Sequence, residues 1–256
     1  MNEDKTVIFK FKTVQTNPIR ILFESLKNIL ADVNFKVDSQ GIKLTTVDGT
    51  QKAIINLILY GNKFEEYICK REINIGLNLI SIFKILKGIK NTDTISFTVY
   101  EEDDSFIYLT TEHTDKRATI TSKVRMLDLD EKIYNIPDIK FDSYITMPSS
   151  DFQGYISDLV TISTEIVLTA NKEKFTMKAS GDFAEQTISI KENGDSESKT
   201  GITNTGKFNI KFIQLFTKCT NLCGTVEIYL KTGYPFTIVY NVANLGQIKY
   251  CLAPNP

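Results

Sequence analysis

The feature that most constrains this chain is an internal repeat that relates its two halves. A helix-like segment at 17–30 aligns with another at 150–163, and a second segment at 79–87 aligns with 212–220. Both pairs share an offset of 133 residues with almost no gaps. A long internal repeat fixes the architecture before any local pattern does. We therefore predict two copies of one domain, each long enough to bury its own core.

Composition narrows the function classes. The 256 residues carry a formal net charge of −1, which excludes a protein that coats nucleic acid through bulk positive charge. Any contact with nucleic acid must instead use local segregation of charge. No apolar run approaches the roughly 20 residues that span a bilayer, and the N-terminal segment lacks the apolar core of a signal peptide. We expect a soluble, intracellular protein.

Strand signals dominate both halves. Segments such as TVIFKFK (6–12) and TISFTVY (94–100) alternate or are rich in β-branched and aromatic residues, and TISFTVY aligns at the same offset with the segment from Glu227. Two short helices interrupt the strands in each half. The first has one apolar stripe, with spacings of three and four, formed by Ile19, Leu22, Phe23, Leu26, Ile29 and Leu30.

The segment 126–137 matches neither copy of the repeat. A flexible linker would be rich in Gly and Ser, whereas this segment is rich in apolar side chains, which must pack against the protein surface to be shielded from water. We predict an extended connector that crosses the surface of both domains. The predicted organisation is an N-terminal domain at 1–125, the interdomain connector at 126–137 and a C-terminal domain at 138–256.

Signals for catalysis and metal binding are weak. The chain has one histidine, His113, no phosphate-cradling glycine pattern and no nucleophile elbow. Acidic pairs such as Asp103–Asp104 fall in turns, where a solvated surface explains them. The four cysteines are Cys69, Cys219, Cys223 and Cys251. They are too few and too scattered for a disulfide framework, and a metal site would need more ligands than they and the distant His113 supply. We expect buried thiols, no catalytic residues, no metal and no cofactor.

Basic residues recur on three of the four predicted helices, on the side away from the apolar stripe. These residues are Arg20, Lys27, Lys84, Lys87, Lys211 and Lys218. The third helix presents Gln153, Ser157 and Thr161 at its outer face instead. Lysines on exposed helices can hold phosphates without reading bases. The pattern predicts weak, salt-sensitive and sequence-independent contact with a DNA duplex.

Several short stretches, in this order and with the repeat, resemble one known family. They are ESLKNIL (24–30), GLNLISIFKILK (76–87), MLDLD (126–130), IP (136–137), MPSSDF (147–152), KASGDF (178–183), LFTK (215–218) and YCLAP (250–254). The chain resembles proliferating cell nuclear antigen, the DNA sliding clamp of eukaryotes, archaea and some large DNA viruses. The abundance of Lys, Ile and Asn favours a large DNA virus or a protist as the source.

The resemblance implies an α+β DNA-clamp fold with two repeated domains per chain. Three chains would join head to tail into a ring with inner helices and outer sheets, through edge strands near 116–125 and 185–191. The implied function is a processivity factor that encircles duplex DNA and makes no covalent chemistry. Its implied partners are DNA polymerase, a clamp loader and other replication and repair proteins that carry a short peptide motif. The implied location is the nucleus, or a cytoplasmic viral factory.

The resemblance also assigns residues. The six basic helix residues fall where the family faces DNA, whereas the third helix departs from the family with Gly154 and Ser157. Lys172 aligns with a lysine that some relatives modify with ubiquitin. The positions that match the family's partner-peptide site are Val47, Ile54, Tyr134, Ile136, Pro137, Pro235, Ala253 and Pro254.

Three alternatives remain open at this point. The chain could be one subunit of a heterotrimeric checkpoint-type or archaeal clamp, which needs non-identical neighbours. It could be an open-form processivity factor that holds DNA without closing around it. A hydrolase in the acidic turns is the third, and the missing His, Cys and glycine constellations speak against it.

Overall fold

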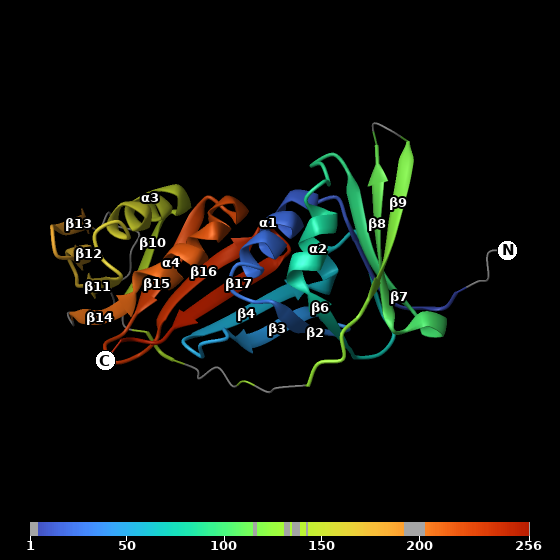
Figure 1. Ribbon diagram of the computed structural model, residues 1–256, viewed down its shortest axis with the longest axis horizontal. Helices are drawn as coiled ribbons and strands as arrows, with labels where there is room; N and C mark the ends of the chain where they lie inside the picture. Colours follow the sequence, from blue (N-terminus) through green and yellow to red (C-terminus); the bar gives the residue numbers. More distant parts are fainter. Residues whose placement is uncertain are drawn as a thin grey trace. The chain divides into compact units, whose positions relative to one another are not determined.

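The computed structural model describes residues 5–114, 117–130, 134, 139–141, 143–191 and 203–255. The chain divides into two compact units (Figure 1). Unit 1 contains Met1–Thr46, Asn56–Ile133 and Val242–Gln247, and unit 2 contains Val47–Ile55, Tyr134–Asn241 and Ile248–Pro256. Each unit therefore includes a hairpin tip from the other half of the sequence.

In its described residues, unit 1 contains two α-helices and strands that belong to two sheets. One sheet has the strand order β5-β1-β7-β8-β9, and the strands of the other follow the order β4-β3-β2-β6. The elements are β1 (Val7–Thr13), α1 (Thr16–Leu26), β2 (Asp32–Asp38), β3 (Gly41–Val47), β4 (Ala53–Tyr60), η1 (Gly61–Lys63), β5 (Glu66–Cys69), β6 (Ile73–Asn78), α2 (Leu79–Leu86), β7 (Thr94–Tyr100), η2 (Glu101–Asp103), β8 (Phe106–His113) and β9 (Ala118–Arg125). β9 is an edge strand, as expected for the described part of 116–125.

Unit 2 repeats this plan. Its strands follow the orders β13-β12-β11-β14 and β10-β15-β16-β17, and β13 ends its four-stranded sheet, so it is also an edge strand, as expected. The elements are β10 (Ser143–Pro148), α3 (Ser149–Leu159), β11 (Glu165–Ala170), β12 (Lys174–Ser180), β13 (Glu185–Lys191), β14 (Asn204–Asn209), α4 (Ile210–Phe216), η3 (Thr217–Leu222), β15 (Thr225–Leu230), β16 (Phe236–Val242) and β17 (Gly246–Leu252). In the described residues, no helix combines the length and the apolar character that crossing a membrane requires.

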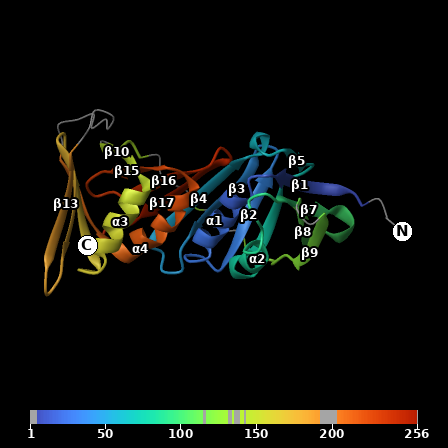
Figure 2. The same cartoon turned by 90° about the horizontal axis from the view of Figure 1, so that it is seen from above.

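Both helix pairs pack through apolar stripes. In unit 1, α1 packs beside α2, and Ile19, Leu22 and Leu26 are buried (Figure 1). In unit 2, α3 packs beside α4, a pairing that is also visible in the view from above (Figure 2). The second helix of each pair begins at an asparagine N-cap whose side chain accepts a backbone N–H, namely Asn78 before α2 and Asn209 before α4.

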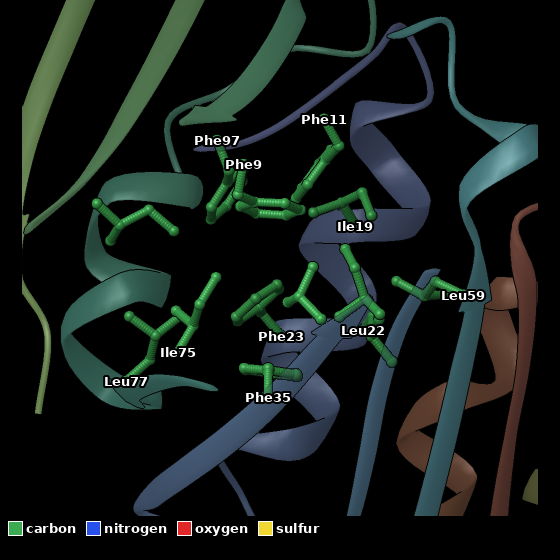
Figure 3. A pocket seen from close by; sticks show the side chains of 13 residues that line it. Phe9, Phe11, Ile19, Leu22, Phe23, Phe35, Leu59, Ile75, Leu77 and Phe97 are labelled. Carbon is green, nitrogen blue, oxygen red and sulfur yellow. The ribbon is translucent and has the colours of Figure 1, made fainter. Parts of the chain in front are cut away.

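The core of unit 1 encloses a small apolar cavity of about 30 Å³ (Figure 3). Its lining comes from both sheets and α1 and includes Phe9, Phe11, Phe23, Phe35 and Phe97. The void could hold about two water molecules at most, and its lining offers them no polar partner, so it is an imperfection of core packing. It does not carry the chemistry of a ligand site.

The structure corrects the offset of the repeat. α1 and α3 keep the expected offset of 133, because they begin at Thr16 and Ser149. The second helices begin at the N-caps Asn78 and Asn209, and the following strands begin at Thr94 and Thr225, so this part is offset by 131 residues. The two-residue difference arises between β3 and β6 of unit 1 and their counterparts. Connecting segments absorb such differences more easily than packed helices do.

The fourth helix also differs from the expectation. We expected Lys211 and Lys218 on one helix face, but α4 ends at Phe216 and Lys218 lies in the 3₁₀ helix η3. The prediction of buried thiols holds for Cys219 and Cys251 but is wrong for Cys69 and Cys223, which are half-buried.

The described start of the predicted connector is extended along unit 1. Leu127 forms a β-bridge with Gly76 of β6, and its N–H donates to the Gly76 carbonyl over 2.9 Å. A Cβ at Gly76 would lie 2.1 Å from the Leu127 carbonyl oxygen, so only glycine permits this approach. Residues 131–133 and 135–138 lie outside the described residues.

Candidate functional site

The six predicted DNA-facing basic residues fall into two groups by exposure. Lys84 and Lys87 of unit 1, and Lys211 and Lys218 of unit 2, are exposed. Arg20 and Lys27 are half-buried rather than free in solvent. The guanidinium of Arg20 donates to Asn17 Oδ1 over 2.6 Å, and Lys27 Nζ lies 4.6 Å from the ring centroid of Phe83 on α2. That cation–π contact ties the two helices of unit 1 together.

Charge is distributed differently on strands and on helices. Seven strand lysines form ion pairs, namely Lys10–Glu66, Lys12–Glu112, Lys36–Glu72, Lys43–Asp38, Lys123–Asp103, Lys178–Glu185 and Lys207–Glu165. Among the described residues, none of the six basic helix residues pairs with a carboxylate. Seven strand lysines are thus neutralised by carboxylates, whereas the six basic helix residues retain uncompensated positive charge although the chain as a whole is slightly acidic.

The helix α3 is the exception, as the sequence predicted. Its exposed positions include Asp151, Gly154, Ser157 and Asp158, and it carries no basic residue. Gln153, which replaces Arg20 in the repeat, is half-buried and donates to the Thr217 carbonyl over 3.2 Å. In unit 2, a neutral hydrogen bond therefore joins the helix regions that a cation–π contact joins in unit 1.

The candidate peptide-binding residues gather in unit 2. The described ones, which we name the hairpin–tail surface, are Val47, Ile54, Tyr134, Pro235, Ala253 and Pro254. The first four are half-buried and the two tail residues are exposed. The hairpin and the tail are joined directly, because the Ala253 N–H donates to the Lys52 carbonyl over 2.9 Å. Ile136 and Pro137 lie outside the described residues.

A buried carboxylate organises the hairpin of this surface. Asp48 is only 4% exposed, and its oxygens accept backbone N–H groups of Thr50, Lys52 and Ala53, each over 2.7 Å. Burial opposes ionisation of Asp48, but hydrogen bonds from the Thr50 hydroxyl and these backbone groups hold the pKa of its carboxyl below the ordinary range. The loop includes Gln51 at a φ of 59°. Asp48 is therefore ionised at neutral pH and fixes a strained turn.

The residue types that ligate metals do not cluster in the described residues. Over the described residues, no group of three or more His, Cys, Asp and Glu side chains could hold a metal ion. The single histidine, His113, instead contacts the buried carboxylate of Asp93, with Nδ1 and Oδ2 2.9 Å apart.

Comparison with known proteins identifies the family. Residues 8–133 match the family model described as proliferating cell nuclear antigen, N-terminal domain, and residues 135–255 match the model for its C-terminal domain. The chain belongs to the proliferating cell nuclear antigen family. Its resemblance to this family, predicted from the sequence, is confirmed, as is the α+β clamp fold with two repeated domains.

Two relatives of this antigen family match the chain over nearly its full length. One is named "Probable DNA polymerase sliding clamp 1", from Paramecium bursaria Chlorella virus 1, and is 30% identical over 258 residues, which cover 98% of each chain. The other is named "Proliferating cell nuclear antigen", from Dictyostelium discoideum, and is 30% identical over 257 residues, covering 96% of this chain and 99% of the relative.

The sequence did not reveal two contributors to the hairpin–tail surface of this family member. Asp48 begins an Asp-Gly-Thr turn, a signal that indicates a loop but not the buried cradle that its carboxylate forms. Asn255 bonds Glu165 over 2.8 Å across 90 residues of sequence, and no local pattern indicates such a contact.

Proposed function

We infer that this chain is a DNA sliding clamp, a non-catalytic processivity factor that encircles duplex DNA and tethers DNA polymerase and other replication and repair proteins. Membership of the family over both of its domains carries the inference. The relatives named as a sliding clamp and as proliferating cell nuclear antigen support it. The predicted division at 1–125, 126–137 and 138–256 remains our proposal for the domain boundaries.

Closure into a ring needs complementary edges on each chain. β9 of unit 1 and β13 of unit 2 each lie at one end of their sheet, so one chain can offer an edge strand from each unit. Three chains that join β9 to β13 head to tail would close a homotrimer, and closure would pair both of these edge strands. Ile120 of β9, which is 54% exposed, would be covered in that assembly.

DNA contact would use the uncompensated helix charges. Four exposed lysines without carboxylate partners in the described residues can approach phosphates without first breaking an ion pair. Such contacts carry no sequence information and weaken steeply with salt, which suits a ring that must slide. The ring, not the affinity, would keep the protein on DNA.

Tethering would use the hairpin–tail surface. A partner peptide with a glutamine and aromatic anchors would dock between the hairpin, the connector and the tail, as the family resemblance implies for Val47, Ile54, Tyr134, Ile136, Pro137, Pro235, Ala253 and Pro254. A modest peptide affinity suffices, because the ring raises the local concentration of the polymerase at the DNA. A separate ATP-driven clamp loader would open the ring. The protein would act wherever this DNA is replicated, in a nucleus or a cytoplasmic viral factory, and Lys172 remains a predicted modification site.

Retention on DNA of defined topology tests this function. The loaded protein should survive a high-salt wash on a nicked circle and slide off a linear duplex of the same sequence. Equal loss from both would contradict a closed ring and favour an open-form processivity factor. Light scattering should give three times the chain mass of 29.0 kDa. A monomeric mass at micromolar concentration would contradict the homotrimer and favour a heterotrimeric clamp.

A further inference from the structure

The C-terminal tail is held at two points, one on each side of Pro254. The Ala253 N–H donates to the Lys52 carbonyl over 2.9 Å, and the Asn255 N–H donates to the Lys207 carbonyl over 2.8 Å. Pro254 has no N–H to contribute. Ala253 and Pro254 remain exposed between these anchors. The tail is thus stretched between the β3–β4 hairpin and the edge strand β14 with its middle accessible.

Three side chains close around the outer anchor, and we name them the tail clasp: Glu165, Lys207 and Asn255. Glu165 Oε1 accepts the Asn255 side-chain amide over 2.8 Å, and Glu165 Oε2 lies 2.6 Å from Lys207 Nζ. In the pairing of β11 with β14, Glu165 is opposite Asn209 and Lys207 is opposite Val167, so the ion pair is a diagonal cross-strand pair. Lys207 therefore contributes twice, through its carbonyl to the tail and through its ammonium to Glu165.

The electrostatics of the clasp favour the ionised carboxylate. Lys207 first, and the Asn255 amide second, hold the pKa of Glu165 below its ordinary range. The side chains of Lys207 and Glu165 are 46% and 42% exposed, and exposed ion pairs contribute little to global stability. The last residues of a domain fray unless they are tied down. The clasp therefore orders the tail without determining whether the domain folds.

We propose that Glu165 is a positioning residue of the hairpin–tail surface: with Lys207 it grips Asn255 and so pre-orders Ala253 and Pro254 for an incoming partner peptide. This inference rests on the peptide docking proposed above. A pre-ordered tail lowers the entropic cost of binding, so loosening the clasp weakens the peptide affinity without removing any residue that the peptide would touch. Salt screens the ion pair and loosens the tail in the same way.

A graded set of variants tests the role of Glu165. Glu165→Gln keeps an acceptor for Asn255 but loses the ion pair, Glu165→Ala loses both, and Asn255→Ala removes only the tail side chain. The matched control is Glu72→Ala, which breaks the exposed Lys36–Glu72 pair of unit 1. Circular dichroism and the scattering mass check that each variant folds and assembles. Asn255→Ala, at the chain end, provides a test without altering any strand.

Two measurements on the full-length protein separate ordering from binding. Hydrogen exchange followed by mass spectrometry reports on residues 250–256, and fluorescence anisotropy reports the affinity for a synthetic peptide with one glutamine and two aromatic anchors. We expect tail exchange to quicken roughly tenfold, and peptide affinity to fall roughly three- to tenfold, in Glu165→Ala and Asn255→Ala. For Glu165→Gln, both the tail exchange rate and the peptide affinity should lie between those of these variants and the wild type, and the peptide affinity should lose part of its salt dependence. Glu72→Ala should match the wild type in both measurements.

Each outcome is decisive. Unchanged tail exchange in Glu165→Ala and Asn255→Ala would overturn the clasp. Faster exchange with unchanged peptide affinity would show that the clasp is structural only, which also overturns the proposal. Absence of peptide binding by the wild type would instead overturn the proposed docking function, and the positioning role of Glu165 with it.

Discussion

The helices α1 and α3 occupy the same place in the repeat, yet only one of them is basic. Both have 11 residues, and neither has a side-chain N-cap. Their inner faces agree, because Phe152, Ile156 and Leu159 of α3 are fully buried like the stripe of α1. Their outer faces differ, because Gln153 and Val160 replace Arg20 and Lys27. The comparison separates what the fold requires, the apolar stripe, from what it leaves free, the outer charge.

The shared inner stripe should give the largest effects. Leu26 and Leu159 are equivalent in the repeat and are each 0% exposed. Truncation to alanine leaves a cavity, so we expect Leu26→Ala and Leu159→Ala each to lower the free energy of unfolding by about 2–5 kcal/mol. Denaturant unfolding of both variants provides the measurement. A loss in only one of them would break the structural equivalence of the two helices.

The basic outer face of α2 and the outer face of α3 should differ strongly in their contribution to DNA contact. Reversal of the exposed pair with Lys84→Glu and Lys87→Glu places repulsive charges opposite phosphate. We expect clamp-dependent stimulation of DNA synthesis to fall by about tenfold at moderate salt. Gln153→Glu, on α3, which carries no basic residue, should change this stimulation far less. Equal effects would show that the charged faces are not the working surface.

Copying the charge of α1 onto α3 should sharpen the comparison further. Gln153→Arg restores the residue found at the equivalent Arg20 and gives up the hydrogen bond to the Thr217 carbonyl. We expect DNA affinity to rise by roughly two- to threefold and the salt dependence to steepen by about one phosphate contact. Asn62→Arg, in the exposed η1 turn of unit 1, adds the same charge as a control. A similar gain from both would attribute the effect to net charge alone.

The sequence predicted the parts of this fold in which apolar residues recur at a regular spacing. The apolar stripes located the helices, and alternation located the strands, because burial of one face imposes a regular spacing. The offset was wrong by two residues after β3, since nothing local records where a connecting segment shortens. The prediction that Lys218 lies on α4 was wrong for a different reason. A 3₁₀ turn continues the hydrophobic spacing of an α-helix for a few residues, so the sequence does not mark where α4 ends.

The site was predictable only where charge or hydrophobicity stands out from its surroundings. The helix lysines were visible because they recur at equivalent positions in a slightly acidic chain. Their lack of carboxylate partners within the described residues was not visible, because ion pairs such as Lys12–Glu112 join residues 100 positions apart. The tail clasp was hidden in the same way. Contacts between distant residues of ordinary type leave no pattern in the sequence.

The smallest expected effect concerns the cation–π contact that joins α1 and α2 in unit 1. Lys27 rests on Phe83, so Lys27→Met keeps the apolar stem and removes only the charge. We expect the free energy of unfolding to fall by at most about 0.5–1 kcal/mol, the value of an exposed cation–π contact. The slope of DNA affinity against salt should decrease by less than one phosphate contact, because the Lys27 ammonium is shared with the ring. A loss as large as that of the Lys84 and Lys87 reversal would show that Lys27 leaves Phe83 when DNA is present, and unit 1 would then contact DNA with both of its helices.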